Sequence, residues 1–264
     1  MINFTRIKGL FMRHFYLIRS SVPRIIDLIY WPTIQIILWG FISKFFSLNA
    51  TTLNYGVGVI LSAAILYDFL FRSSISFNML FLEEIWSRNF TNLFVSPIKI
   101  SEVILALTFT ALIRALIGVV PAVLLITPFF DFSILNLGMT LILLMINLYF
   151  FGISLGLVVS SGLMKYGPAF ENIAWSSLFL LAPIGCVYYP VSILPDWLQT
   201  VAGFFPLVYL FEGSRSILIE NNFEYLYFLK ASIINFIYFT FSVGLFYLAF
   251  FSAKKNGNLI NIGE

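Results

Sequence analysis

Charged side chains are scarce in this sequence. Asp, Glu, Lys and Arg make up 10% of its 264 residues, whereas a soluble domain carries roughly 25%. Hydrophobic residues make up 60%, and the mean hydropathy is +0.97. Most side chains must therefore face something other than water. This excludes a water-soluble globular domain and predicts an integral membrane protein.

Cysteine and histidine are almost absent. The single cysteine, Cys186, excludes an internal disulfide, and together with the single histidine, His14, it cannot supply a zinc or iron site. The chain also has no G-x-x-x-x-G-K-S/T loop to cradle a nucleotide phosphate, and no G-x-S-x-G or H-E-x-x-H motif. We therefore expect no catalytic residues, no metal and no cofactor in this chain.

Long apolar runs are what the sequence does contain. Most are about 18 to 25 residues long, which lets an α-helix cross a hydrocarbon core roughly 30 Å thick. Helices satisfy every backbone group within lipid, so helices are the expected spans. The sequence predicts an all-α polytopic membrane protein, a single domain over residues 1–264, with six transmembrane helices at 25–46, 55–79, 102–126, 135–163, 170–188 and 226–250.

The amino-terminal segment, residues 1–24, has a different pattern. Phe4, Ile7, Phe11 and further apolar residues recur at spacings of three and four, with arginines and a lysine between them. This pattern is typical of an amphipathic helix that lies in the membrane surface.

Lysines and arginines indicate the orientation. With the amino terminus in the cytoplasm, ten of the fifteen lie on the cytoplasmic side. A further crossing within residues 190–219 would move Lys254 and Lys255 outside. Four of the ten prolines fall between Pro183 and Pro206, which also argues against a continuous span. We therefore expect a re-entrant pair of short helices at 190–219 and both termini in the cytoplasm.

A charged, amide-rich stretch, EEIWSRNFTNLFVSP, fills residues 83–97 between the second and third predicted spans. Apolar residues recur at helical spacing from Leu82 onward, which predicts an amphipathic helix over 81–97 that ends at Pro97. Glu84 and Arg88 are four residues apart in the order that stabilises a helix. The segment is either a surface-lying connector or a knob that docks into a soluble partner, and the candidate docking residues are Glu83, Glu84, Arg88, Phe90, Leu93, Phe94 and Pro97.

Two motifs resemble a known family. Ser87-Arg88 followed by Leu93-Phe94-Val95-Ser96-Pro97-Ile98 is similar to the loop between the second and third spans of ABC-2 exporter permeases. The stretch from Tyr189 to Leu198, with Phe205-Pro206-Leu207, Glu212-Gly213 and Arg215, resembles the segment between the fifth and sixth spans of that family. The family's six-span layout covers essentially the whole chain. One departure is that members often have Gly-Thr-x-Glu after the arginine, where this chain has Asn89-Phe90-Thr91-Asn92.

The resemblance implies a mechanism and partners. Two permease chains, a homodimer or a pair of similar chains, would work with two cytoplasmic ABC ATP-binding subunits, which hold ATP and Mg²⁺. ATP binding would close the ATPase pair and push on the helix at 81–97, so that substrate moves outward. The resemblance implies contact with membrane lipid, no nucleic acid, and a place in the bacterial cytoplasmic (inner) membrane.

Charged residues within the predicted spans require partners. An unpaired charge such as Arg114 costs at least a few kcal/mol in the bilayer. Counting 1.5 Å per residue places Asp68 at a similar height, which predicts an Asp68–Arg114 pair. Two alternatives stay open: Arg114 could face the substrate and bind a phosphate or carboxylate headgroup, or Arg72 could take the carboxylate of Asp68 instead.

Small and aromatic residues give further candidates. Gly152, Gly156 and Ser160 form a small-residue ridge, suited to helix packing within the chain or to a dimer contact. Aromatic residues near the outer surface form either an interfacial belt or a gate. The candidate gate and re-entrant residues are Tyr188, Tyr189, Pro190, Pro195, Trp197, Pro206, Glu212 and Arg215, of which the last two are close enough in sequence to pair.

Two function classes follow. The first is the membrane subunit of an ATP-driven exporter for an amphipathic or lipid-linked substrate, with glycans, lipids and drugs all open. The second is a membrane scaffold or assembly factor that docks a soluble protein without transport. A membrane-embedded enzyme is disfavoured because no nucleophile with a base, carboxylate pair or metal set lies within the predicted spans.

Overall fold

The structure is a computed structural model that describes all residues except 1, 50–55, 90–91, 93–95, 131 and 256–264. Its described residues form helices and turns, and no strand occurs among them. The α-helices are α1 (Phe4–Arg19), α2 (Val22–Asn49), α3 (Gly56–Trp86), α5 (Ile100–Phe130), α6 (Met139–Tyr166), α7 (Glu171–Ile184), α8 (Asp196–Ala202), α9 (Pro206–Glu220) and α10 (Tyr225–Lys255). Short 3-10 helices lie at Ile134–Leu137, Pro168–Phe170 and Val191–Ile193.

Among the described residues, 5 helices are long and apolar enough to cross a membrane, namely α2, α3, α5, α6 and α10. The structure thus agrees with an all-helical integral membrane protein. The predicted fifth span, 170–188, contains α7, which has 14 residues and is shorter than a span. The helix ends here because Gly185 terminates it and Cys186 takes a left-handed backbone conformation, with φ of 52°.

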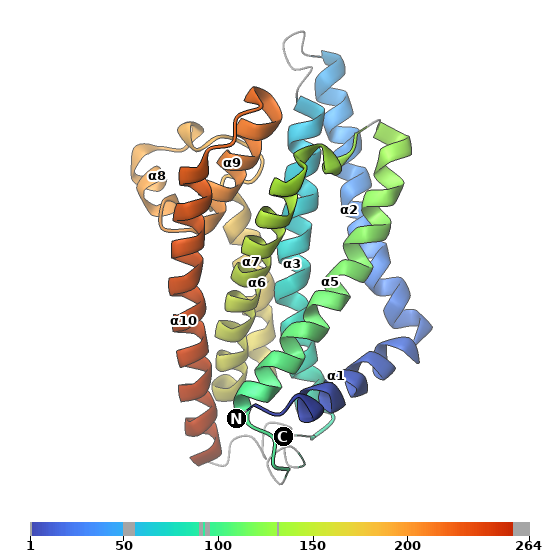
Figure 1. Cartoon of the computed structure of the whole chain (residues 1–264), viewed down its shortest axis with the longest axis vertical. Coiled ribbons are helices and arrows are strands. Elements are labelled where there is room, and N and C mark those ends of the chain that lie inside the picture. Colours follow the sequence, from blue (N-terminus) through green and yellow to red (C-terminus); the bar gives the residue numbers. More distant parts are fainter. Residues whose placement is uncertain (1, 50–55, 90–91, 93–95, 131, 256–264) are drawn as a thin grey trace.

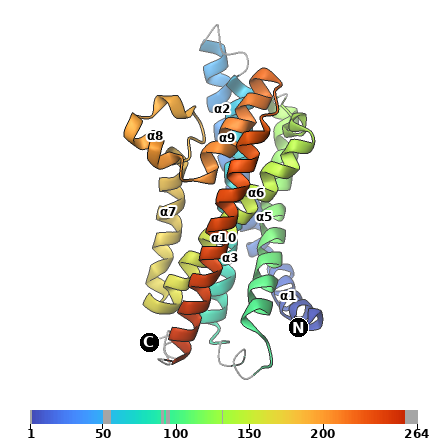
Figure 2. The same cartoon turned by 60° about the vertical axis from the view of Figure 1, so that its left-hand side comes forward.

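The helices form an elongated bundle (Figures 1 and 2). α1 lies across one end, and the last turn of α10 and the described parts of the connection between α3 and α5, residues 87–89, 92 and 96–99, lie at that same end. α8 and α9 lie toward the opposite end. The amino-terminal helix and the end of the last helix therefore share one end of the bundle, here called the α1 end.

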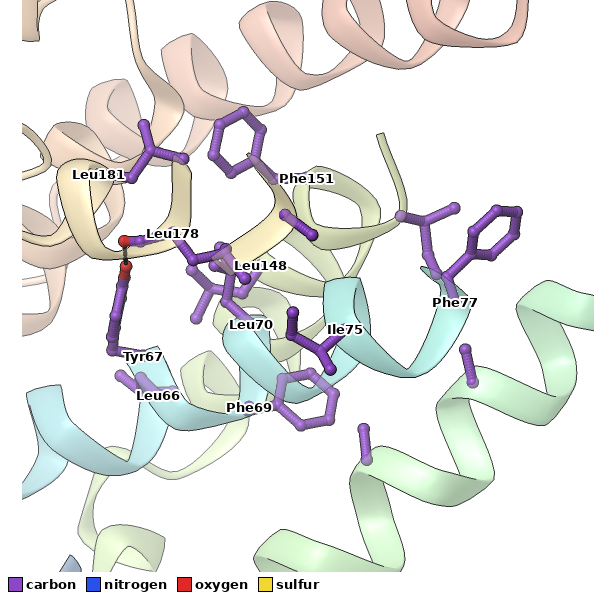
Figure 3. Packing of buried hydrophobic residues seen from close by; sticks show 14 of the residues in the cluster. Leu66, Tyr67, Phe69, Leu70, Ile75, Phe77, Leu148, Phe151, Leu178 and Leu181 are labelled. Atoms are coloured by element: carbon purple, nitrogen blue, oxygen red, sulfur yellow. Dashed lines mark hydrogen bonds between the residues drawn. The ribbon is translucent and has the colours of Figure 1, made fainter. Parts of the chain in front are cut away.

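α3 is the central helix. In its most apolar segment 72% of the residues are buried, whereas only 17% are buried in the corresponding segment of α10. Side chains of α3 pack against α6 and α7 in a continuous apolar core, part of which is shown in Figure 3. The hydroxyl of Tyr67 on α3 donates a hydrogen bond to the carbonyl of Leu178 on α7. α7 is therefore held on α3 by a polar contact as well as by apolar packing.

The small-residue ridge of α6 faces α3. A Cβ atom added at Gly152 would lie 2.9 Å from the carbonyl oxygen of Leu70, and one added at Gly156 would lie 3.0 Å from Cβ of Phe77. One turn further on, the Ser160 hydroxyl donates to Oδ1 of Asn78 at 3.1 Å. The ridge lets two helix backbones approach closely within one chain.

Candidate coupling site

The segment around Glu83 begins as the last turn of α3. α3 continues to Trp86, beyond the predicted end of the second span at residue 79. It continues because Leu82 and Ile85 belong to the buried face of the same helix. The chain then turns at Arg88, whose φ is 52°. The predicted helix over 81–97 is therefore not one continuous helix in its described part.

Glu84 is fully buried at the end of α3 and binds α1. Its side chain is 1% exposed, forms an ion pair with Arg13, and lies with Oε1 at 3.0 Å from Nε2 of His14, which is 0% exposed. Its other oxygen, Oε2, accepts a hydrogen bond from the side-chain amide of Asn89 at 2.6 Å. Glu84 thus ties the amino-terminal helix to the turn that follows α3.

Glu83 connects α3 to two other helices. Its Oε1 atom lies 3.4 Å from NH1 of Arg114 on α5 and 3.7 Å from NH1 of Arg24 at the start of α2. Glu83 is partly exposed, at 20%, and Arg114 is nearly buried, at 12%. One carboxylate on α3 therefore faces arginines from both neighbouring helices.

Glu102 repeats this role at the start of α5. Its Oε2 atom accepts a hydrogen bond from the backbone N–H of Lys99 at 2.9 Å, the capping interaction expected of a Glu at this position. Its Oε1 atom accepts from the N–H of Asn3 at 2.8 Å, just before α1. Arg6 lies 3.8 Å from Glu102 and donates to the carbonyl of Pro97.

Together, Glu83, Glu84 and Glu102 form what we call the carboxylate cluster. It joins α1 to both ends of the connection between α3 and α5. Glu83 and Glu84 face the bundle and α1, whereas Trp86, Ser87 and Arg88 are the exposed residues of the turn. Phe90, Leu93 and Phe94 lie outside the described residues.

The arginines and His14 of α1 and Glu102 were not singled out from sequence. Glu102 lies three residues after Lys99, but Lys99 is not one of the residue types that mark a capping box, so this spacing was no clear signal for the contact. The α1 contacts had no signal either, because they join residues far apart in the sequence, such as His14 and Glu84.

The charges within the spans pair differently from the prediction. Asp68 lies beside Arg72, with Oδ2 at 3.5 Å from Nε, as in the alternative raised above. Arg114 pairs with Glu83 and not with Asp68. The reason is that α3 extends past residue 79, and α5 crosses it obliquely (Figure 1), so that Arg114 meets the end of α3.

A second polar cluster fixes the α8–α9 segment, residues 185–220. NH1 of Arg215 donates to the carbonyl oxygens of Cys186 at 2.9 Å and Val187 at 3.2 Å. NH2 of Arg215 lies 3.1 Å from Glu212, and Glu212 accepts from the N–H of Val191 at 2.7 Å. The Glu212–Arg215 pair therefore fastens α9 to the chain that follows α7.

The aromatic and proline candidates lie around this segment. Tyr188 stacks on Trp39 of α2 with ring centroids 4.0 Å apart, and the Tyr189 hydroxyl donates to the Pro183 carbonyl at 2.8 Å. Trp197 on α8 is 69% exposed. Three prolines occupy positions that need no N–H donor within a helix: Pro190 and Pro195 precede Val191–Ile193 and α8, and Pro206 begins α9.

A comparison with protein-family models matches residues 7–219 to the ABC-2 type transporter model. The match spans α1 through α9 and includes the carboxylate cluster and the Glu212–Arg215 pair. The chain belongs to the ABC-2 type transporter family. No curated protein matched the sequence.

Membership of the ABC-2 family gives the site its context. These proteins are the permease components of transporters, and they act with an ATP-binding subunit instead of carrying out catalysis themselves. In this ABC-2 chain, the connection between α3 and α5 lies at the α1 end and is bound to three different helices. The connection is therefore held by direct polar contacts at both of its ends.

Proposed function

We propose that this chain is the permease subunit of an ATP-driven exporter. Two copies would act with two cytoplasmic ATP-binding subunits in the bacterial cytoplasmic membrane. The α1 end would face the cytoplasm, in agreement with the distribution of lysine and arginine. The family match supports the permease role, and the carboxylate cluster supports the site of coupling.

The single observation that carries the proposal is the set of ion pairs around the connection between α3 and α5. Glu84 binds α1, Glu83 binds α2 and α5, and Glu102 binds the residues before α1. A push on the exposed Trp86–Arg88 turn would therefore reach four helices through direct polar contacts. A passive surface connector has no need of such contacts.

We further propose a sixth crossing of the membrane. α6 and α10 both run toward the α1 end, so the chain between them must return to the opposite end (Figure 1). α7 covers the first part of this return, and α9 leads on to the start of α10. The α8–α9 segment would then be the re-entrant element on the outer side.

The proposed substrate is amphipathic or lipid-linked, which includes glycan carriers, lipids and drugs. Support comes from the helices themselves, because α2 and α10 expose many large apolar side chains and few charges. An amphiphile could keep its tail in contact with such surfaces while its polar part crosses.

The coupling role is tested by reconstituting the full chain with its ATP-binding subunit and measuring co-purification and ATP hydrolysis. We expect Leu93→Asp or Phe94→Asp to abolish co-purification without preventing membrane insertion. Phe204→Asp is the matched control, because Phe204 is an exposed phenylalanine in the α8–α9 segment, away from the α1 end. Unchanged complex formation in the two variants would contradict the coupling role.

The transport role has a separate readout. Vesicles that contain the complex should show outward movement of an amphipathic substrate that depends on ATP. Docking of the ATP-binding subunit without stimulated hydrolysis or transport would instead favour a scaffold.

A further inference from the structure

A cavity of about 480 Å³ lies between α2, α3, α5 and α7. Its volume is within the range of roughly 300–1,000 Å³ that small-molecule sites occupy. Arg72 and Arg114, each about half-way along its helix, line the cavity. Two arginines half-way along membrane-spanning helices carry a large free-energy cost in a bilayer unless other groups neutralise them or they bind a ligand.

The two arginines are only partly satisfied. Each guanidinium has five N–H donors. The closest carboxylate contacts are 3.5 Å for Arg72 and 3.4 Å for Arg114, longer than the 2.7–2.9 Å of strong charge-assisted hydrogen bonds. Nε of Arg114 is buried and has no hydrogen-bond partner within the described structure, and Nε of Arg72 has only the 3.5 Å contact with Asp68. Both side chains therefore retain donors for an anionic group.

The charges that face the cavity favour an anion. Its charged lining consists of Arg72, Arg114 and Asp27. Asp68 and Glu83, which neutralise the arginines, do not belong to the lining. Asp27 already accepts a hydrogen bond at 3.0 Å from the indole N–H of Trp31. Two guanidinium groups thus meet the cavity against one carboxylate, which also attracts Arg114.

The remaining walls are apolar and aromatic. Phe71 lies between Trp175 and Phe179 of α7, with ring centroids 5.6 and 5.7 Å away. Trp31 and Phe179 are 56% and 66% exposed on the outside of the chain. An acyl or prenyl tail could lie along these rings while its headgroup reaches the arginines.

We propose that this cavity binds an amphiphile with a phosphate headgroup, which Arg72 and Arg114 hold together. Guanidinium forks match the tetrahedral oxygens of phosphate in paired hydrogen bonds. The inference rests on the proposed exporter function, because it names the class of substrate that the exporter would bind in this cavity. Binding itself requires no ATP-binding subunit.

The test uses the full chain in nanodiscs that contain phosphatidylcholine with or without phosphatidic acid, and native mass spectrometry to count retained lipids. Wild-type protein should retain one phosphatidic acid in preference to phosphatidylcholine. Arg72→Gln and Arg114→Gln should each weaken this preference about tenfold, the effect of losing one charge-assisted interaction. Lys165→Gln, which removes an exposed positive charge at the end of α6, should leave it unchanged.

A second variant covers the case in which an arginine substitution prevents folding. Gln35→Trp would fill the cavity without changing its charge, and it should also remove the preference for phosphatidic acid. Equal retention of phosphatidic acid by wild type and these variants would overturn the proposal. Competition by inorganic phosphate that fully displaces the lipid would also overturn it, because the site would then recognise a free anion and not an amphiphile.

The two proposals can fail separately. Wild-type protein that shows no preference for phosphatidic acid but still couples to the ATPase would refute only the cavity assignment. Specific lipid retention by a chain that binds no ATP-binding subunit would refute only the exporter function.

Discussion

Nε2 of His14 lies 3.0 Å from Oε1 of Glu84, and both side chains are shielded from solvent. This contact joins α1 to the last turn of α3, although residues 14 and 84 are 70 positions apart in the sequence. The amino-terminal helix is therefore a fixed part of the bundle end. In the proposed coupling role, a force applied to the turn after α3 would reach α1 through this contact.

Glu84→Ala should loosen α1. The substitution leaves Arg13 and His14 without their carboxylate, and an unsatisfied buried polar group costs about 1–3 kcal/mol. We expect a lower unfolding temperature and faster proteolytic release of α1 from the purified chain. Glu220→Ala, at the exposed end of α9, is the control and should behave as wild type. Equal protease resistance in the two variants would show that the cluster does not hold α1.

Arg114 should be energetically coupled to Glu83 and not to Asp68. In double-mutant cycles of unfolding free energy, residues in contact show coupling of roughly 0.5–3 kcal/mol, whereas separated residues are nearly additive. Arg114→Ala combined with Glu83→Ala should therefore be non-additive. The combination with Asp68→Ala should be additive, and strong coupling there would contradict the observed pairing.

Gly156→Leu should destabilise the fold. A Cβ atom at this position already lies 3.0 Å from Phe77, and overpacking of this kind costs about 1–3 kcal/mol. Gly244→Leu on α10 is a matched control, because nothing lies within 4 Å of its Cβ position. Folded yield after size-exclusion chromatography should fall for the first variant only. A normal yield of Gly156→Leu would mean that α3 and α6 can separate at little cost.

Arg215→Ala should expose Cys186 to thiol reagents. The cysteine is 0% exposed, so a thiol reagent cannot reach its sulfur in the folded protein. Wild-type protein should therefore react slowly with maleimide at neutral pH. Loss of the Arg215 hydrogen bonds to Cys186 and Val187 should open the α8–α9 segment and raise the rate about tenfold, equivalent to about 1.4 kcal/mol.

The readout is specific because Cys186 is the chain's single cysteine. Cys186→Ser gives the background, and Lys230→Ala, which removes a cation near the Tyr209 ring, controls for a nearby loss of charge. No change in labelling on removal of Arg215 would show that other contacts hold the segment closed.

Long apolar runs made most of the helices predictable. The predicted spans 135–163 and 226–250 correspond to α6, Met139–Tyr166, and α10, Tyr225–Lys255. Hydropathy alone is enough to locate these two helices, because they are apolar along nearly their whole length. The family was also predictable from the local motifs around Pro97 and Pro190, and the family-model match confirmed it.

The ends of α3 and α7 could not be predicted in this way. Glu83 and Glu84 were predicted to belong to a separate amphipathic helix over 81–97, yet they continue α3, and arginines of other helices neutralise them. The partner of Arg114 depends on the tilt of α5, which no local pattern records. By contrast, the Asp68–Arg72 contact spans one helical turn, and sequence spacing was enough to raise it.

The seam between α3 and α6 restricts how this bundle can rearrange. The backbones of α3 and α6 are closest where Gly152 and Gly156 contact Leu70 and Phe77. Neither a lipid tail nor a row of water molecules could pass between the two helices there. α3 and α6 should therefore move together as one rigid unit. If the chain acts as the proposed exporter, its substrate would pass along another boundary, and the cavity that α2 and α7 line together with α3 already provides empty volume there.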